Sequence, residues 1–149
     1  MTLLHHAGVC CRDLDESLRF YRDGIGLEVL ADVVLDADLA PLLGVTTTSV
    51  RTVFLGAGDR PDAGIVELLQ LGVDSVDDAP PQAGTPMRGV FLLSLQVDVD
   101  EVLSRLAELG FGGAPLSMPI LGGGRAATVV DPDGVMVELL PLGGLSVMK

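Results

Sequence analysis

The chain has 149 residues, a length typical of one domain and sufficient to bury a hydrophobic core. Apolar residues make up 48% of the sequence and charged residues 20%, which excludes an intrinsically disordered chain. The formal net charge of -12 argues against nucleic-acid binding, because this field would repel a phosphate backbone and no Lys/Arg cluster offsets it locally.

The first half of the chain predicts the element order β-α-β-β-β. A strand is expected over residues 3–11, followed by a helix that begins at Leu14, because Asp13 and Glu16 form a D-x-x-E capping box. Three runs rich in Val, Ile and Leu then predict strands at 27–35, 50–55 and 64–71. Between the first two of these runs, residues 38–44 predict a short helix or a lid over a site.

The second half predicts the same order after an inter-module linker at about 72–88. A strand is expected over 89–97 and a helix capped by Asp98, and further strands are expected around 114–118, 125–130 and 135–142. Residues 131–134, Asp-Pro-Asp-Gly, predict a tight turn between the last two strands, because proline presets one turn dihedral and glycine accepts the left-handed one.

Two short sequences recur in the two halves. Val-Glu-Leu-Leu occurs at 66–69 and at 137–140, and the acidic helix start at 13–16 returns at 98–101. Such a repeat indicates one structural unit used in tandem. We therefore predict an α+β fold in which two βαβββ modules, about 3–71 and 89–142, form a cupped mixed sheet with helices on the outside, within one domain spanning 1–149.

The repeat also places two carboxylates at equivalent positions. Glu67 and Glu138 lie in mid-strand among apolar neighbours, where an unpaired carboxylate is costly. A metal ion, an arginine such as Arg51 or Arg125, or a raised pKa would each satisfy them. Because paired modules usually share one site, both carboxylates are expected to face one ligand, with His6 of the first strand.

Strand alternation gives expectations for the neighbours of His6. Cys10 has the same strand parity as His6, whereas His5 is expected to face the opposite way. Cys10 and Cys11 are adjacent, which argues against a disulfide between them and predicts reduced thiols. No basic leader with a long apolar run and no stretch of about 18 apolar residues is present, so we expect a cytoplasmic protein.

These residues resemble a known family. Residues 6–21 (HAGVCCRDLDESLRFY) with Ile-Gly-Leu at 25–27 resemble the opening of vicinal oxygen chelate proteins, which include glyoxalase, methylmalonyl-CoA epimerase, extradiol dioxygenases and bleomycin- and fosfomycin-resistance proteins. Residues 129–134 and 137–140 resemble the closing hairpin of that family. The resemblance covers nearly the whole chain and is specific for the fold rather than for the reaction.

The resemblance implies a divalent metal ion held by His6, Glu67 and Glu138. The ion would be Zn, Ni, Co, Mn or Fe. The fourth ligand position falls at Phe91, or at Leu92 if the strand slips by one residue, and neither side chain binds a metal. Ser94 or Gln96 would be the nearest compensating groups. With one histidine, the set departs from the two-histidine, one-carboxylate pattern of an extradiol dioxygenase.

The leading hypothesis is a metal-assisted glyoxalase- or epimerase-like lyase or isomerase. It would act on a small carbonyl substrate through an enediolate, with Glu138 or Glu67 moving the proton. The expected pocket residues are Cys10, Arg51, Phe91, Met118 and Arg125. Two alternatives remain: a metal-free protein that sequesters an antibiotic or natural product, and a metal-free acid/base enzyme or dioxygenase-like protein on the same fold. Exposed sheet edges and the resemblance predict a homodimer.

Overall fold

The computed structural model describes residues 1–72 and 85–143. Most of the predicted linker at 72–88 therefore lies outside the described residues. The chain divides into two compact units, one holding the first four strands and the other the last four together with Asp23–Gly26. This short stretch is tied to the second unit by Arg105, whose guanidinium donates to the carbonyl oxygens of Gly24 and Ile25 at 2.9 and 3.1 Å.

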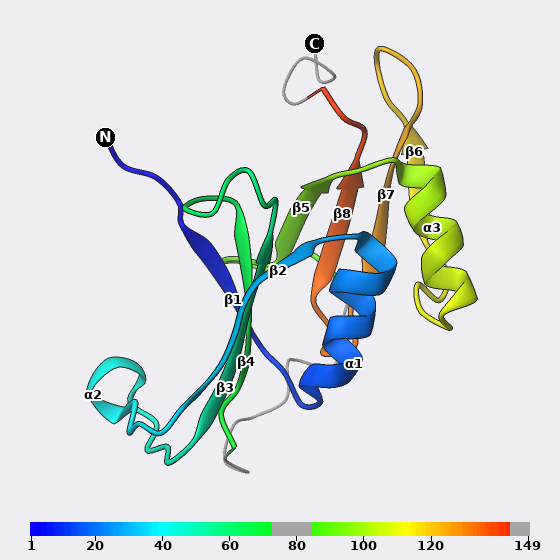
Figure 1. The fold of residues 1–149 in the computed structure, drawn as a ribbon. Coiled ribbons are helices and arrows are strands. Elements are labelled where there is room, and N and C mark those ends of the chain that lie inside the picture. Colours follow the sequence, from blue (N-terminus) through cyan, green and yellow to red (C-terminus); the bar gives the residue numbers. More distant parts are fainter. Residues whose placement is uncertain (73–84, 144–149) are drawn as a thin grey trace. The chain divides into compact units, whose positions relative to one another are not determined.

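The first unit is a four-stranded mixed sheet with the strand order β1-β4-β3-β2 (Figure 1). β1 and β4 are parallel, and the other pairs are antiparallel. The elements of the first half of the chain are β1 (His6–Cys10), α1 (Leu14–Leu18), the π-helical η1 (Arg19–Ile25), β2 (Glu28–Leu35), α2 (Ala40–Leu43), β3 (Val50–Gly56) and β4 (Ile65–Gln70). The end of η1 belongs to the stretch that clusters with the second unit.

The second unit repeats this plan in the order β5-β8-β7-β6. Again the first and last strands of the module are parallel and the remaining pairs antiparallel. Its elements are β5 (Leu92–Gln96), α3 (Val99–Glu108), β6 (Leu116–Pro119), β7 (Arg125–Val130) and β8 (Met136–Leu140). The prediction of two tandem βαβββ modules is confirmed.

Both predicted helix starts are confirmed by the same local geometry. The Asp13 carboxylate accepts from the backbone N–H of Glu16 at 3.2 Å, and the Asp98 carboxylate accepts from that of Glu101 at 3.1 Å. Each aspartate thereby satisfies one of the amides that a helix leaves without an internal partner. The turn between β7 and β8 is also as predicted, since Gly134 has φ 92° and donates its N–H to the Asp131 carbonyl at 3.1 Å.

Strand alternation gives each sheet a packed face and a face that carries the repeated glutamate. The buried apolar residues of the packed faces are Val9, Val53, Leu55, Val66 and Leu68 in the first unit and Ala127, Val129, Val137 and Leu139 in the second. Glu67 is opposite Phe54, and Glu138 is opposite Thr128, so these four side chains lie on the other faces. We call these the carboxylate faces of the two modules.

The segment between β2 and β3 is closed by its own side chains. Asp38 accepts from the backbone N–H groups of Ala40 and Thr47, at 3.0 and 3.2 Å, and the Thr47 hydroxyl donates to the Ala37 carbonyl at 2.7 Å. The short helix expected within 38–44 is therefore present as α2. Its Leu42 side chain is 81% exposed.

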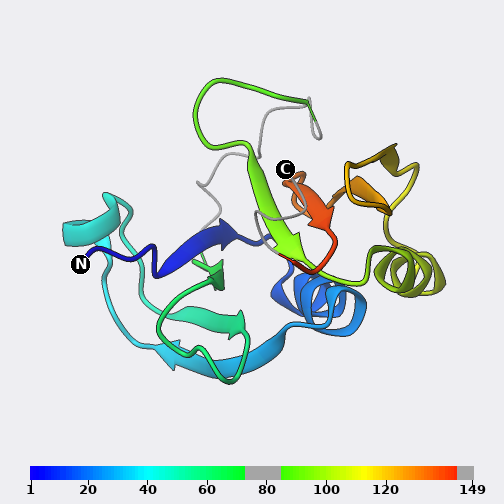
Figure 2. The ribbon, with the colours of Figure 1, turned by 90° about the horizontal axis from the view of Figure 1, so that it is seen from above.

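β2 is the outer strand of the first sheet, as Figure 2 also shows (light blue). Val33 and Val34 point to opposite faces of this strand and are 41% and 62% exposed. An edge strand with unpaired backbone groups and exposed valines is a surface that another chain can extend. Among the described residues, no helix is both long and apolar enough to cross a bilayer.

Candidate functional site: a histidine and carboxylate pair

His6 and Glu67 meet on the carboxylate face of the first module. The parallel pairing of β1 with β4 places Gly8 opposite Glu67, and His6 two residues earlier on the same face. The His6 Nε2 atom lies 3.0 Å from Oε2 of Glu67, and the side chains are 40% and 14% exposed. A half-buried carboxylate is thus matched to an imidazole that solvent reaches.

Two side chains of β3 complete the surroundings of this pair. The Thr52 hydroxyl donates to Oε1 of Glu67 at 2.8 Å. The Phe54 ring meets the His6 ring edge to face, with centroids 5.9 Å apart and an interplanar angle of 84°. Neither residue was predicted from the sequence. Because both alternate with the apolar Val53 and Leu55 along the strand, this pattern could have placed them together on the opposite face.

The expectation that His5 faces away from His6 is wrong. The two Nδ1 atoms lie 2.8 Å apart, so one ring donates and the other accepts. The reason is that β1 begins only at His6, so strand alternation does not govern the preceding residue. A metal-binding histidine commonly has its other nitrogen held by a carboxylate, a backbone carbonyl or water, and here the Nδ1 atom of His5 takes that place.

The second module holds Glu138 differently. The Ser94 hydroxyl donates to Oε2 of Glu138 at 2.7 Å, and Ser94 occupies the register position of Gly8. The register counterpart of His6 is Leu92, two residues before Ser94. The alternative placement at Phe91 is wrong, because only Val97 lies between β5 and the Asp98 cap, whereas two residues lie between β1 and Asp13.

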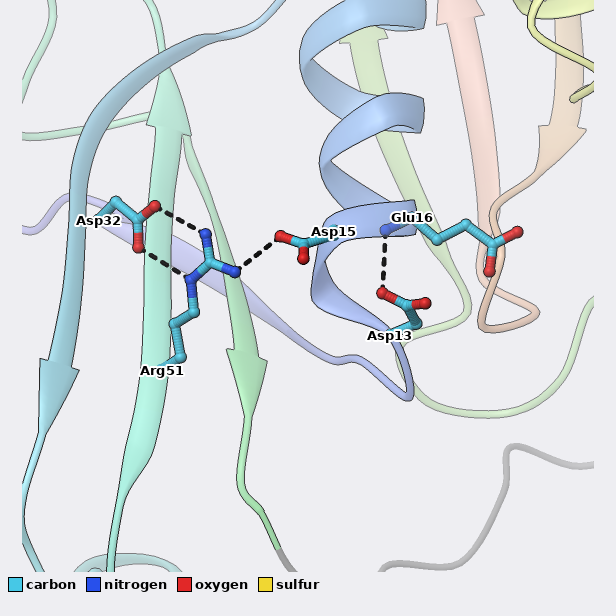
Figure 3. A network of polar contacts seen from close by, with 5 residues as sticks. All are labelled: Asp13, Asp15, Glu16, Asp32 and Arg51. Carbon is cyan, nitrogen blue, oxygen red and sulfur yellow. Dashed lines mark hydrogen bonds and ion pairs between the residues drawn. The ribbon is translucent and has the colours of Figure 1, made fainter.

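Arg51 and Arg125 do not satisfy the two glutamates. Arg51 lies on the packed face, where Nε and Nη2 donate to Asp32 at 3.1 and 2.9 Å and Nη1 donates to Asp15 at 2.7 Å (Figure 3). Its guanidinium holds the pKa of the Asp32 carboxyl below the usual range, mainly through these hydrogen bonds. Arg125 donates through Nε and Nη2 to Asp100, at 2.9 and 2.7 Å.

The other expected pocket residues lie in different places. Cys10 is exposed on β1 and shares the face of His6 by strand parity. Met118 pairs with Ala126 on β7, shares the face of Glu138, and is 64% exposed. Phe91 precedes β5 and is 37% exposed. The assignment of a substrate pocket to these residues stays a prediction.

The His6 and Glu67 donors suit two adjacent positions of a divalent ion. Two ligand atoms at about 2.1 Å from a metal and about 90° apart are separated by roughly 3 Å, and the two donors here are 3.0 Å apart. One imidazole nitrogen and one carboxylate oxygen are ligands that Zn, Ni, Co, Mn and Fe accept. Within the described residues, no group of three His, Cys, Asp or Glu side chains gathers to hold a metal. The first module thus supplies two metal ligands, and a complete metal site would need further ligands.

Comparison with known proteins gives a consistent picture of the family. The model of the Glyoxalase/Bleomycin resistance protein/Dioxygenase superfamily matches residues 3–139. A lactoylglutathione lyase-like protein, terB, of Aspergillus terreus is 32% identical over 146 residues, covering 92% of this chain and 74% of its own.

Solved structures show the same fold at lower identity. Glyoxalase I of Leishmania major is 24% identical with a TM-score of 0.62, covering 95% of this chain and 87% of that one. A glyoxalase family protein of Bacillus cereus reaches a TM-score of 0.67 at 16% identity, with 93% of each chain covered. TnmS3, an antibiotic binding protein from Streptomyces, is 24% identical with a TM-score of 0.57, covering 95% of this chain and 96% of its own.

Proposed function

The chain belongs to the Glyoxalase/Bleomycin resistance protein/Dioxygenase superfamily, and on this premise we propose that it is a metal-assisted, glyoxalase- or epimerase-like lyase or isomerase. The proposed substrate is a small molecule with a carbonyl group. The observation that carries the proposal is the His6–Glu67 pair, with donor atoms 3.0 Å apart on a face that solvent reaches. The lactoylglutathione lyase-like relative supports the same class of reaction.

The proposed metal ligands are His6, Glu67 and Glu138. A bound divalent ion would polarise the substrate carbonyl and so make a neighbouring proton more acidic. The chain's own contribution is to hold the donors and to move that proton. His6 is oriented by His5 and Phe54, and Glu67 is held by Thr52.

Glu138 or Glu67, whichever leaves the metal or is not bound to it, would accept and return the proton. A carboxylate acts as a general base when it lies within hydrogen-bond reach of the substrate proton and keeps an oxygen free for it. Ser94 engages one oxygen of Glu138, so the hydroxyl would orient this carboxylate while its second oxygen receives the proton. Substitution of Glu138 by Gln is expected to abolish turnover. The amide oxygen of the glutamine can still accept the hydrogen bond from Ser94.

A metal-free binding protein is the second candidate. The register position of His6 in the second module is taken by Leu92, and two large apolar side chains on the face of Glu138, Leu116 and Met118, are 69% and 64% exposed. These features favour an apolar ligand such as an antibiotic or natural product. A metal-free acid/base enzyme that uses Glu67 and Glu138 is the third.

Elemental analysis of the purified protein, expressed with Mn, Fe, Co, Ni and Zn supplied, tests these proposals. The metal-assisted reading expects near-stoichiometric metal that is lost in His6→Ala. Leu92→Ala is the matched control, because Leu92 is the register counterpart of His6 in the second module and its side chain binds no metal. Metal absent from the wild type, or retained by His6→Ala, would overturn the metal site, and a search for a bound small molecule would follow.

We further propose that the protein is a cytoplasmic homodimer. The exposed outer strand β2 supports association. Cys10 and Cys11 are adjacent in the sequence, which argues against a disulfide between them and suits a reducing compartment. Sedimentation equilibrium, with and without a charged substitution at Val34, distinguishes a dimer through this edge from a monomer.

A further inference from the structure

Thr52 is the most deeply buried polar group on the carboxylate face of the first module. It is 2% exposed, and its hydroxyl donates to Oε1 of Glu67 at 2.8 Å. The other oxygen, Oε2, is 3.0 Å from Nε2 of His6. The two oxygens of Glu67 therefore have different partners, one a hydroxyl and one an imidazole.

The position of Thr52 makes its hydroxyl a rigid donor. β3 is paired with β2 on one side and with β4 on the other, so its backbone is held from both sides. A threonine side chain also has few χ1 states because of its branched Cβ. A free carboxylate turns about its last bond, and a hydrogen bond from a fixed donor to one oxygen stops this rotation. The hydroxyl thus fixes the plane of the carboxylate, with the second oxygen turned toward His6.

The second module shows what changes when this donor is missing. By register, Ala126 occupies the position of Thr52, since each residue lies two before the one opposite the glutamate. There the carboxylate is held instead from the first strand of the module, through Ser94 to Oε2 at 2.7 Å. The residue in the place of His6 is Leu92. The hydroxyl groups that bind the two equivalent carboxylates thus come from different strands, the third of the first module and the first of the second.

We propose that Thr52 is a positioning residue whose hydroxyl holds Oε1 of Glu67 and so keeps Oε2 turned toward Nε2 of His6, where both atoms would become ligands when a divalent ion takes the place of the proton between them. The part that concerns the ion rests on the proposed function, whereas the orientation of Glu67 toward His6 does not. In this arrangement the first module holds two metal ligands, Nε2 of His6 and Oε2 of Glu67, in a fixed relative position.

The test compares Thr52→Val, which keeps the shape and removes the hydroxyl, with Thr52→Ser, which keeps the hydroxyl. The first readout is the ¹⁵N–¹H spectrum of the imidazoles in the metal-free protein, which is simple because the chain has 2 histidines. Thr52→Val is expected to shift the Nε2 resonance of His6 as its partner is released, and Thr52→Ser to restore it. Ser94→Ala is the matched control, a hydroxyl removed from the other carboxylate, and is expected to leave the His6 resonances in place.

The second readout is the dissociation constant for Co²⁺, measured by calorimetry. Loss of a group that orients a ligand weakens metal binding by about 10- to 100-fold, so this range is expected for Thr52→Val, with Thr52→Ser within about threefold of the wild type. Thermal unfolding confirms that each variant is folded, and Thr52→Ala replaces Thr52→Val if the latter is not.

The outcomes separate the two proposals. Unchanged His6 resonances in Thr52→Val, or equal defects in the Val and Ser variants, would overturn the role of the hydroxyl. Failure of the wild type to bind Co²⁺ would overturn the metal-assisted function, and the imidazole spectra would still decide the role of Thr52.

Discussion

Replacement of Arg51 by methionine should cost more stability than the same replacement of Arg125. The two arginines are register counterparts, each lying three residues before the residue opposite the repeated glutamate. Each reaches the second residue after its helix cap, Asp15 or Asp100. Arg51 also holds Asp32 of β2 through two parallel hydrogen bonds, which Arg125 lacks in its own contacts with Asp100.

The magnitudes follow from these contacts and from exposure. The Asp15 and Asp100 side chains are 81% and 78% exposed, so each pair with them is worth about 0.2–0.5 kcal/mol after screening by solvent. Asp32 is 41% exposed and bound bidentately, which places this pair near the upper end for surface pairs, about 1 kcal/mol. We expect a loss of about 1–1.5 kcal/mol for Arg51→Met and about 0.5 kcal/mol or less for Arg125→Met.

Urea unfolding measures both losses as shifts of the midpoint at an unchanged m-value. Arg51→Lys is the matched control, because it keeps the charge and loses the planar two-bond contact with Asp32, so its loss should lie between those of the wild type and Arg51→Met. Equal losses for the two methionine variants would refute this reasoning, as would a double-mutant cycle between Arg51 and Asp32 that shows no coupling.

Two further predictions concern the site and the response to acid. Leu92→His places an imidazole in the register of His6 beside Glu138, and it should tighten divalent-metal binding by about tenfold or more, measured by calorimetry against Leu92→Ala; equal affinities would contradict the assigned register. Arg51 lowers the pKa of Asp32 from 3.8, so this carboxylate stabilises the fold above that pH and its contribution is lost as the pH falls through the lowered pKa. Asp32→Asn should therefore flatten the acid side of the stability profile, and an unchanged slope there would count against the Asp32–Arg51 pair.

The parts of the fold that follow local rules were predictable from the sequence. Two of these features are the helix caps at Asp13 and Asp98, and a third is the turn at 131–134. Each depends only on residues within four positions of one another, so the local sequence is sufficient to predict it. The strand β7 has the bounds expected for it, 125–130, because apolar β-branched residues end at a turn signal. The repeat then supplied the module architecture.

The partners of the site residues were not predictable in the same way. Thr52 contacts Glu67, and Ser94 contacts Glu138, only because neighbouring strands pair. The sequence does not fix the register of that pairing, and a shift of one residue would turn each side chain to the other face. The sequence offers Ser94 as a compensating group but does not assign its partner. It also favours Arg51 and Arg125 as pocket residues, because arginine suits a carboxylate, and their position on the packed faces follows only from the pairing of β3 with β4 and of β7 with β8.

The duplication separates what the fold needs from what the site needs. On the packed faces both modules keep the same contact, an arginine from the third strand bound to an aspartate in the first turn of the helix. On the carboxylate faces the glutamate is the same, whereas the polar residues around it differ: His6 is replaced by Leu92 and Thr52 by Ala126. Because the helix contact survives every one of these changes, it serves the βαβββ architecture rather than a ligand. The two glutamates, in contrast, are held by different partners, Thr52 and His6 for Glu67 and Ser94 for Glu138, so each carboxylate is oriented by the side chains of its own module.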